Sequence, residues 1–453
     1  MKVNLEEEYR HLKLGDSRRA KRFVKLVSQL VNNPESNICE RCYSWPDIKG
    51  AYRFFSNKKV KEISLAKAIR NATRERCLQN EMVLCIQDTT NAAFASSAKG
   101  LGYLDHGKGI GMMVHNILAV DSRGCPLGIL HQNIWSRKLE QKGKAKNRQQ
   151  RAITQKESNR WLKGITHCEK ELADCKKIVT IADREADIYE LFAQPRTPNS
   201  ELLIRAIHNR KTLLGNTIWE EVAAQKVIAQ FNLEIGDPRT GEIRIAKMSI
   251  RTTMLVLAPP TKKADLPAII VYGLLVREED ACDLKETLEW KLISSMPVEN
   301  DQMAMQLVKW YSYRWRIERF HYILKSGCRL EHLQLRTLTA LRKAVLTYSL
   351  SAFKLMQLLY QSRIEPEQPS TNYLSEQECQ AIYIFNYKVK LVQKQPLALS
   401  KAIWLIARMG GYIGRNNDGP PGIQTLWRGL QKLHAIMQVY SVSPTSYPHF
   451  GFG

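Results

Sequence analysis

The spacing of apolar residues divides the chain into a helical start, a strand-rich middle and a helical end. Residues 16–31 repeat apolar side chains at intervals of three and four, with Asp16 placed as the N-cap. This spacing predicts an amphipathic helix whose apolar face consists of Ala20, Phe23, Val24, Val27, Leu30 and Val31. The opposite face is densely cationic, and a solvated surface is the usual explanation of such a run.

Short apolar runs begin near residue 82 and predict the strands of a sheet. They cover residues 82–88, 111–120, 126–135 and 177–183, with a helix predicted over 153–172 and a basic loop over 136–151. The first and last of these strands end in Asp88 and Asp183. The order of three strands, a helix and a further strand fits an RNase H-like α/β core.

Further apolar runs between residues 199 and 297 predict a β-rich insertion into this core. Helical spacing then returns, and the stretch WYSYRWRIERFHYILK (310–325) predicts one helix. Its apolar face consists of Trp310, Ile317, Phe320, Ile323 and Leu324. A polar tract over 361–373 predicts a linker. We therefore expect three domains, over residues 1–70, 71–365 and 366–453.

The composition indicates a polyanionic partner. The 453 residues carry a formal net charge of +24, and a surface this basic gains most by binding DNA, RNA or anionic membrane. Membrane is the weakest of these, because the most apolar stretch, 344–360, contains a lysine and several polar residues. The start of the chain has no apolar signal region, so we expect a cytoplasmic protein.

Three acids stand out as candidate metal ligands: Asp88, Asp183 and Glu318. Clustered carboxylates raise one another's pKa values, and divalent cations relieve that repulsion. Mg²⁺ prefers oxygen ligands, and a pair of such ions clamps both sides of a phosphoryl displacement. Each acid alone has an ordinary explanation, since an Asp after a strand is usually a turn residue and a Glu among arginines a surface ion pair.

A family resemblance supports the first interpretation. Residues 311–325 read Y-x2-R-x3-E-x6-K, which resembles the signature of the insertion-sequence-four family of bacterial cut-and-paste DDE transposases. The segments GAYRFFSN (50–57), IQDTT (86–90), IADREADIY (181–189) and 406–430 are similar to further parts of that family. The resemblance implies an RNase H-like catalytic core flanked by a helical DNA-binding domain and a helical C-terminal domain.

The resemblance also implies roles for individual residues. Asp88, Asp183 and Glu318 would bind two Mg²⁺ ions, with Mn²⁺ as a substitute, and Trp290 would receive a flipped base. Trp315 lies on the predicted helix of Glu318, and for it core packing is as good an explanation as a contact with DNA. The remaining candidates are DNA-contacting residues: Tyr311, Arg314, Lys325, Arg205, His208, Arg210, Lys211, Arg18, Arg19, Arg22 and Arg53.

The implied reaction is the excision of a DNA element by nicking, hairpin formation and hairpin opening, followed by joining to target DNA. The implied partners are double-stranded DNA, with terminal inverted repeats, and a second copy of the chain. Residues from about 374 onward would pair the two copies, through a helix over 425–440. Two alternatives remain: a catalytically silent DNA-end-binding inhibitor and a simple RNase H-like nuclease. The apolar stripe of that helix could equally pack on its own domain: Leu426, Trp427, Leu430, Leu433 and Met437.

Overall fold

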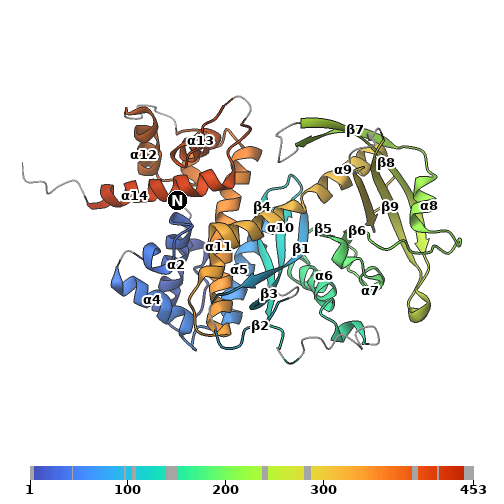
Figure 1. The fold of residues 1–453 in the computed structure, drawn as a ribbon, viewed down its shortest axis with the longest axis horizontal. Helices are drawn as coiled ribbons and strands as arrows, with labels where there is room; N and C mark the ends of the chain where they lie inside the picture. The colour runs from blue at the N-terminus through green and yellow to red at the C-terminus, as the bar shows by residue number, and fades with distance from the viewer. Residues whose placement is uncertain are drawn as a thin grey trace, which may run out of the picture.

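Helices gather at one end of the molecule and a long sheet forms the other, with one long helix between them (Figure 1). The computed structural model describes residues 5–42, 44–95, 98–104, 109–138, 140, 151–236, 243–279, 287–389, 396–415 and 418–442. Most of the predicted basic loop over 136–151 lies outside these residues.

Five helices form the N-terminal unit: α1 (Leu5–Glu8), α2 (Ser17–Asn32), α3 (Ile38–Arg41), α4 (Trp45–Ser56) and α5 (Glu62–Cys77). The predicted helix over 16–31 is confirmed as α2, and the Asp16 side chain accepts a hydrogen bond from the backbone N–H of Arg18 as its N-cap. Phe23, Val27, Leu30 and Val31 on its apolar face are buried. The predicted domain boundary at residue 70 falls inside α5.

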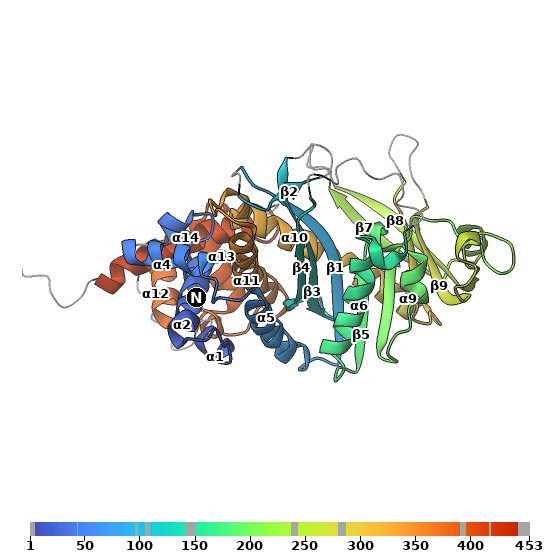
Figure 2. The same cartoon turned by 90° about the horizontal axis from the view of Figure 1, so that it is seen from below.

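The predicted core sheet is confirmed and has the strand order β4-β3-β1-β5-β6. Strand β3 pairs antiparallel with β1 and β4, whereas β1, β5 and β6 run parallel, which is an RNase H-like arrangement. Helix α6 packs against β1, β4 and β5 (Figure 2). The elements are β1 (Met82–Ala93), β2 (Gly102–Tyr103), β3 (Ile110–Asp121), β4 (Pro126–Trp135), α6 (Asn159–Glu171), β5 (Lys177–Ala182), α7 (Tyr189–Ala193) and β6 (Ser200–Arg205).

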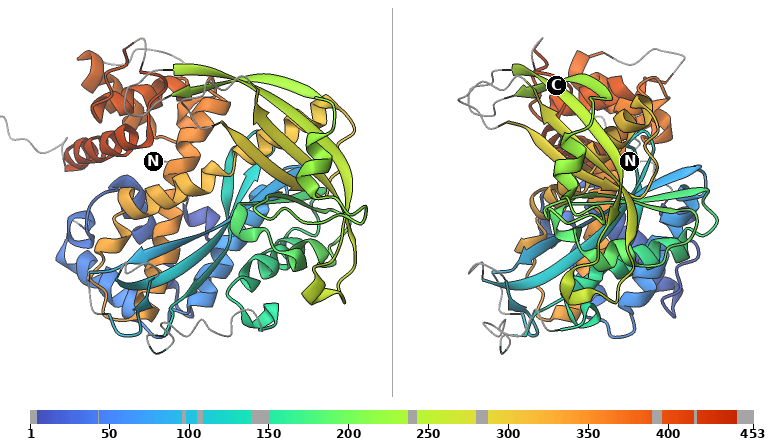
Figure 3. Two further views of the ribbon diagram at one scale, coloured as in Figure 1. Left: turned by 45° about the vertical axis from the view of Figure 1, so that its right-hand side comes forward. Right: turned by 90° about the vertical axis from the view of Figure 1, so that its right-hand side faces the viewer.

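The β-rich insertion extends this sheet instead of forming a separate one. Strand β10 pairs antiparallel with β6, and the order continues through β9 and β8 to β7 (Figure 3). The apolar runs over residues 242–250 and 252–258, predicted as two strands, are one long strand, β8, and the short helix α8 was not predicted. The elements are α8 (Ile218–Ala223), β7 (Ala229–Gly236), β8 (Ile243–Leu257), β9 (Ile269–Glu278) and β10 (Glu289–Ser294).

The prediction of one helix over residues 310–325 is wrong. Helix α9 (Asp301–Ser312) ends inside this stretch. Helix α10 (Trp315–Tyr322) starts after a tight turn, and Ile323–Gly327 form a π-helical turn. The backbone N–H groups of Tyr313 and Arg314 donate to carbonyls three residues back, which tightens the chain between the two helices. The five apolar side chains of the predicted face are nevertheless all buried.

Helix α11 (Leu338–Ile364) joins the two ends of the molecule. It packs against α2, α4 and α5 of the N-terminal unit, against β4, and against α13 and α14 (Figure 1). The C-terminal helices are α12 (Glu376–Tyr387), α13 (Leu399–Met409) and α14 (Ile423–Val442). No helix within the described residues is long and apolar enough to span a membrane.

The apolar stripe of the predicted interface helix packs inside its own chain, as the alternative to a dimer contact predicted. Leu426, Trp427, Leu430 and Leu433 on α14 are buried, and Met437 is partly buried against the same core. The ring of Trp427 covers Gly327, where a Cβ atom would lie 2.7 Å from the ring, and its Nε1 donates to Glu35 at 3.0 Å. These contacts join α14 to the π-helical turn after α10 and to the N-terminal unit.

Candidate active site

Asp88 on β1 and Asp183, which directly follows β5, lie at the same level of two neighbouring parallel strands. The last register pair between β1 and β5 is Ile86 with Ile181, and each aspartate follows two residues later. Because side chains alternate along a strand, both carboxylates belong to the same face of the sheet as this pair. The prediction that Asp88 ends its strand is wrong, since β1 continues to Ala93 through its pairing with β3.

The charges of Asp183 and Glu318 both act on the carboxyl group of Asp88. Burial and then the charge of Asp183 raise the pKa of Asp88 to about 7. Glu318 raises the pKa of Asp88 further, while the backbone N–H of Thr89 and the Arg314 guanidinium lower it. The Asp183 side chain caps the 3₁₀ turn Arg184–Ala186 and accepts from the N–H of Glu185 at 3.0 Å. The three predicted acids are therefore close enough for Asp183 and Glu318 to raise the pKa of Asp88.

Glu318 reaches this site from α10, which packs on β1. Its carboxylate is 2.6 Å from the Nη1 atom of Arg314. In the part of the chain that the structure describes, no three His, Cys, Asp or Glu side chains are close enough to hold one metal ion. The oxygen-only donors and the mutual repulsion of Asp88 and Asp183 fit a divalent cation. Glu318 fits as a third ligand only if its ion pair with Arg314 opens.

A chain of buried or partly buried polar side chains, Gln132, Asn116 and His321, leads to the carboxylate of Asp88. Burial and then the charge of Lys325 lower the pKa of His321 to about 3, so its ring is neutral. The amide nitrogen of Gln132 donates to the Asn116 oxygen at 2.7 Å, so the Asn116 nitrogen donates to His321 Nε2 at 2.8 Å. The ring proton is then on Nδ1, which faces Asp88 Oδ2 at 3.7 Å.

A second polar connection lies on the other face of β1. Arg160 on α6 donates from Nε to the hydroxyl of Thr89 at 2.8 Å and from Nη2 to Glu185 at 2.7 Å. This guanidinium joins the strand of Asp88 to the turn of Asp183. Sequence reasoning missed Arg160 and His321. His321 offered a signal, since it lies three residues after Glu318 on the same helix, whereas Arg160 offered none.

The remaining residues of the signature surround Glu318 on three different elements. Tyr311 lies in the last turn of α9, and the centre of its buried ring is 6.4 Å from the ring centre of half-buried Trp290. Lys325 lies on the π-helical turn and donates to Asn91 of β1 at 3.3 Å. Trp315 is 60% exposed, and the Arg314 guanidinium stacks 4.9 Å from its ring centre. The exposure of Trp315 argues against core packing.

The four predicted contacts at the end of β6 and in the loop after it differ in exposure. Arg205 is half-buried and donates to the backbone oxygen of Glu289 at 3.3 Å. His208 and Lys211 are exposed. Arg210 instead forms a buried ion pair with Asp187. Its guanidinium is therefore not presented to a ligand on the surface.

The predicted contacts of the N-terminal unit lie on α2 and α4. Arg18 is exposed beside Asp16, Arg19 donates to the backbone oxygen of Leu14, and Arg22 pairs with Asp47 at 2.7 Å. Arg53 on α4 is exposed. Sequence reasoning missed Trp45 and Lys49, which are exposed at intervals of four residues before Arg53 and thus share its face.

Comparison with known families divides the chain into three matches. A model described as "Transposase DNA-binding" matches residues 1–60. One described as "Transposase DDE domain" matches residues 105–353, more than half of the chain, which include Asp183 and Glu318 but start after Asp88. One described as "Transposase Tn5 dimerisation domain" matches residues 350–448.

A solved structure with a similar chain trace is a piggyBac transposase synaptic complex with hairpin DNA, determined by cryo-electron microscopy. The two chains are 9% identical with a TM-score of 0.40, over 95% of this chain and 73% of the other. A likeness this distant bears on neither mechanism nor partners.

Proposed function

This chain belongs to the transposase DDE domain family, and from that membership we propose that it excises a DNA element and joins its 3′ ends to target DNA. The observation that carries the proposal is the pair of aspartates at one level of two parallel strands, with Glu318 facing them from α10. We further assign the chain to the insertion-sequence-four group, with most likeness to the transposase of transposon five, on its Y-x2-R-x3-E-x6-K signature.

Family membership implies dependence on a divalent metal. We assign Asp88, Asp183 and Glu318 as the residues that would hold two Mg²⁺ ions, with Mn²⁺ as a substitute. Bound there, such ions would activate the attacking oxygen and stabilise the leaving oxygen of a phosphoryl displacement. An arriving DNA phosphate would compete with Glu318 for Arg314, because a guanidinium binds phosphate as well as carboxylate in bidentate geometry. That competition would release Glu318 toward the aspartates.

The neighbouring side chains would hold the DNA strand. Lys325 offers charge to a phosphate beside Glu318. Arg314 and Tyr311 are buried in the structure, and we assign them to the same DNA strand on the signature. Trp290 and Trp315 offer aromatic rings for stacking, which is worth about 1 to 3 kcal/mol per base. We propose that hairpin formation follows nicking and precedes hairpin opening. Trp290 would receive a base that is flipped out while the hairpin forms.

The N-terminal unit would bind the ends of the element. The outer face of α4 presents Trp45, Lys49 and Arg53 in one exposed stripe. Arg18 is exposed on α2, whereas Arg22 and Lys25 are already paired with Asp47. We expect the α4 stripe and Arg18 to contact DNA directly, and Arg22 to fix α4 against α2.

Two copies of the chain would bring two element ends together. The match to a dimerisation domain covers the C-terminal half of α11 and helices α12 to α14. Because the inner stripe of α14 is buried, the contact must use outward side chains of this unit. Exposed apolar residues suited to it are Phe385, Tyr387, Val389, Ile413 and Val439.

A strand-transfer assay with end-labelled element DNA and a plasmid target tests this function. A transposase yields nicked ends, hairpins and joined products with Mg²⁺. A catalytically silent inhibitor would retain the ends without cutting them, and a nuclease would release cut ends that are never joined. Either of these outcomes would replace the proposal.

A further inference from the structure

Asp187, the second aspartate of the segment DREAD (183–187), takes no part in the site described above. Its fully buried carboxylate accepts hydrogen bonds from the backbone N–H groups of Ile207 at 2.7 Å and His208 at 2.8 Å. It also forms an ion pair with Arg210, whose guanidinium donates back to the main-chain oxygen of Asp187 at 2.9 Å. One carboxylate thus binds three groups of the loop 206–211.

This loop carries two of the expected DNA contacts. His208 and Lys211 are exposed, and Arg205 precedes the loop at the end of β6. Arg210 is different, because its side chain is only 10% exposed and its guanidinium lies 5.6 Å from the ring centre of Phe192. Arg210 therefore stabilises the loop from inside, whereas His208 and Lys211 are exposed and could contact DNA.

The loop also connects two parts of the site. The backbone N–H of Ala206 donates at 2.7 Å to the carbonyl of Lys291, the residue after Trp290 on β10. Asp187 itself lies four residues after Asp183, beyond the 3₁₀ turn that Asp183 caps. The Asp187 carboxylate is consequently placed between the turn of Asp183 and the strand of Trp290.

We propose that Asp187 is a positioning residue, which holds the loop 206–211 as a rigid DNA-contacting edge beside Asp183. A loop fixed before binding loses less conformational freedom when it contacts DNA, so its charges contribute more to affinity. The inference rests on the proposed function, because it assigns this edge to the binding of element ends.

A double-mutant cycle on DNA-end affinity tests the proposal in the full chain. Lys211→Gln should weaken binding and reduce the salt dependence of log K by about 1, because it removes one phosphate contact. Asp187→Asn keeps an acceptor oxygen but loses the charge that pairs with Arg210. In that background, Lys211→Gln should have less than half of its original effect on affinity, since a loosened loop no longer fixes the lysine.

Fully additive effects of the two substitutions would overturn the inference. Arg210→Gln breaks the same ion pair and keeps both backbone hydrogen bonds, so it repeats the cycle if Asp187→Asn does not fold. Glu278→Gln is the matched control, because Glu278 is an equally buried carboxylate paired with Arg244 on β8. Lys211→Gln should keep its full effect there. If the unaltered chain neither binds nor cuts element ends, the proposed function fails, whereas additivity in an active enzyme defeats only the role of Asp187.

Discussion

The buried carboxyl group of Asp88 lowers the folding stability of the metal-free protein at neutral pH. The unfolded chain loses this proton near pH 3.8, whereas the folded chain keeps it until about pH 7. Folding stability therefore falls as the pH rises from about 4 to about 7, by up to about 4 kcal/mol. A bound divalent cation would remove this penalty.

Asp88→Asn should accordingly raise the melting temperature in EDTA at about pH 8, and the gain should vanish below about pH 4, where both side chains are neutral. Added Mg²⁺ should stabilise the unaltered protein more than the variant, which lacks one ligand. Thermal melts across pH measure both effects. Glu81→Gln, at an exposed ion pair, is the control. An equal response of Asp88→Asn and the unaltered protein to Mg²⁺ would argue against a metal at Asp88.

Trp290 allows a test that separates two steps of the reaction. Trp290→Ala should slow hairpin formation by about tenfold or more, because stacking of one base is worth about 1 to 3 kcal/mol. The first nick needs no flipped base and should keep its rate. Gel analysis of nicked and hairpin products over time distinguishes the steps. Equal slowing of both would make Trp290 a packing residue beside Tyr311.

Sequence reasoning found the three acids because they follow apolar strand patterns or a known signature. It missed His321 and Arg160, because their roles depend on Asn116, Thr89 and Glu185, which are distant in sequence. Arg210 was wrongly predicted as a DNA contact. A cation in a basic segment was expected at the surface, yet a buried acid pairs with it.

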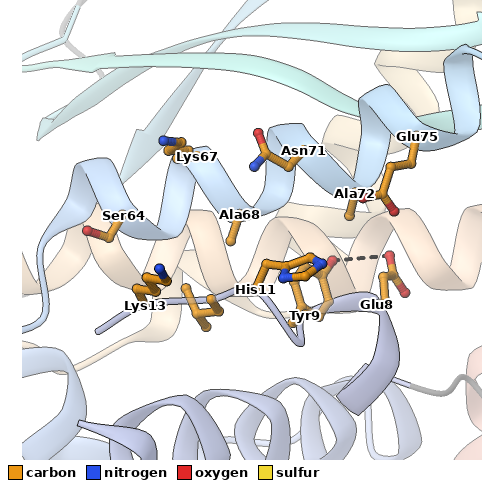
Figure 4. A pocket seen from close by; sticks show the side chains of 11 residues that line it. Glu8, Tyr9, His11, Lys13, Ser64, Lys67, Ala68, Asn71, Ala72 and Glu75 are labelled. Atoms are coloured by element: carbon orange, nitrogen blue, oxygen red, sulfur yellow. Dashed lines mark hydrogen bonds between the residues drawn. The ribbon is translucent and has the colours of Figure 1, made fainter. Parts of the chain in front are cut away.

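At the level of helices and strands, the N-terminal segment 5–14, which includes α1, is held by the buried carboxylate of Glu8. Glu8 accepts from Arg76 on α5 and pairs with Lys354 on α11, both at 2.7 Å. Burial lowers the pKa of Lys354 to about 8, despite the opposing effect of Glu8. Figure 4 shows this segment beside α5, where a pocket of about 360 Å³ lies between them.

Glu8→Gln should therefore loosen residues 5–14, because it leaves Lys354 buried without an anion, at a cost of about 3 to 5 kcal/mol. Hydrogen exchange of the backbone amides in this segment should become faster. Glu7→Gln changes an exposed neighbour paired with Arg10 and should leave exchange unchanged. Unchanged exchange in Glu8→Gln would show that apolar packing alone holds the segment.

The boundaries of elements were harder to predict than their existence. Apolar spacing located the helices at residues 16–31 and 310–325, but the second is broken at Tyr313 and Arg314. Both residues are compatible with a helix, so local preference gave no sign of the turn. Trp310 and Ile317 are seven residues apart and buried on both sides of the break, so their spacing is the same as in one continuous helix. The continuity of the insertion with the core sheet could not be predicted either, because it depends on long-range pairing of β6 with β10.

At the level of the assembled protein, the burial of the α14 stripe changes how pairing should be tested. Deleting residues 374–453 would uncover α11 and remove the contact of Trp427 with Glu35, so loss of pairing could not be separated from misfolding. Point substitutions on the inner and outer sides of this unit make the distinction.

Leu430→Ala, at a 4% exposed position, should lower stability by about 2 to 5 kcal/mol and leave the paired-end complex intact. Ile413→Glu, at a 65% exposed position, should keep the melting temperature and weaken pairing if this face forms the contact. Thermal melts and the mass of DNA complexes in solution give both readings. Loss of pairing in Leu430→Ala with full stability would return the interface to the inner stripe.

The central claim is that Asp88, Asp183 and Glu318 form one metal-dependent site for cutting and joining DNA. Its most direct test is to measure end binding, nicking and strand transfer with Mg²⁺ for the alanine variant of each acid. We predict that all three variants bind element ends with nearly normal affinity, because phosphate contacts elsewhere supply it, and that none nicks or joins DNA. Nicking at a near-normal rate by any one variant would contradict the claim for that residue.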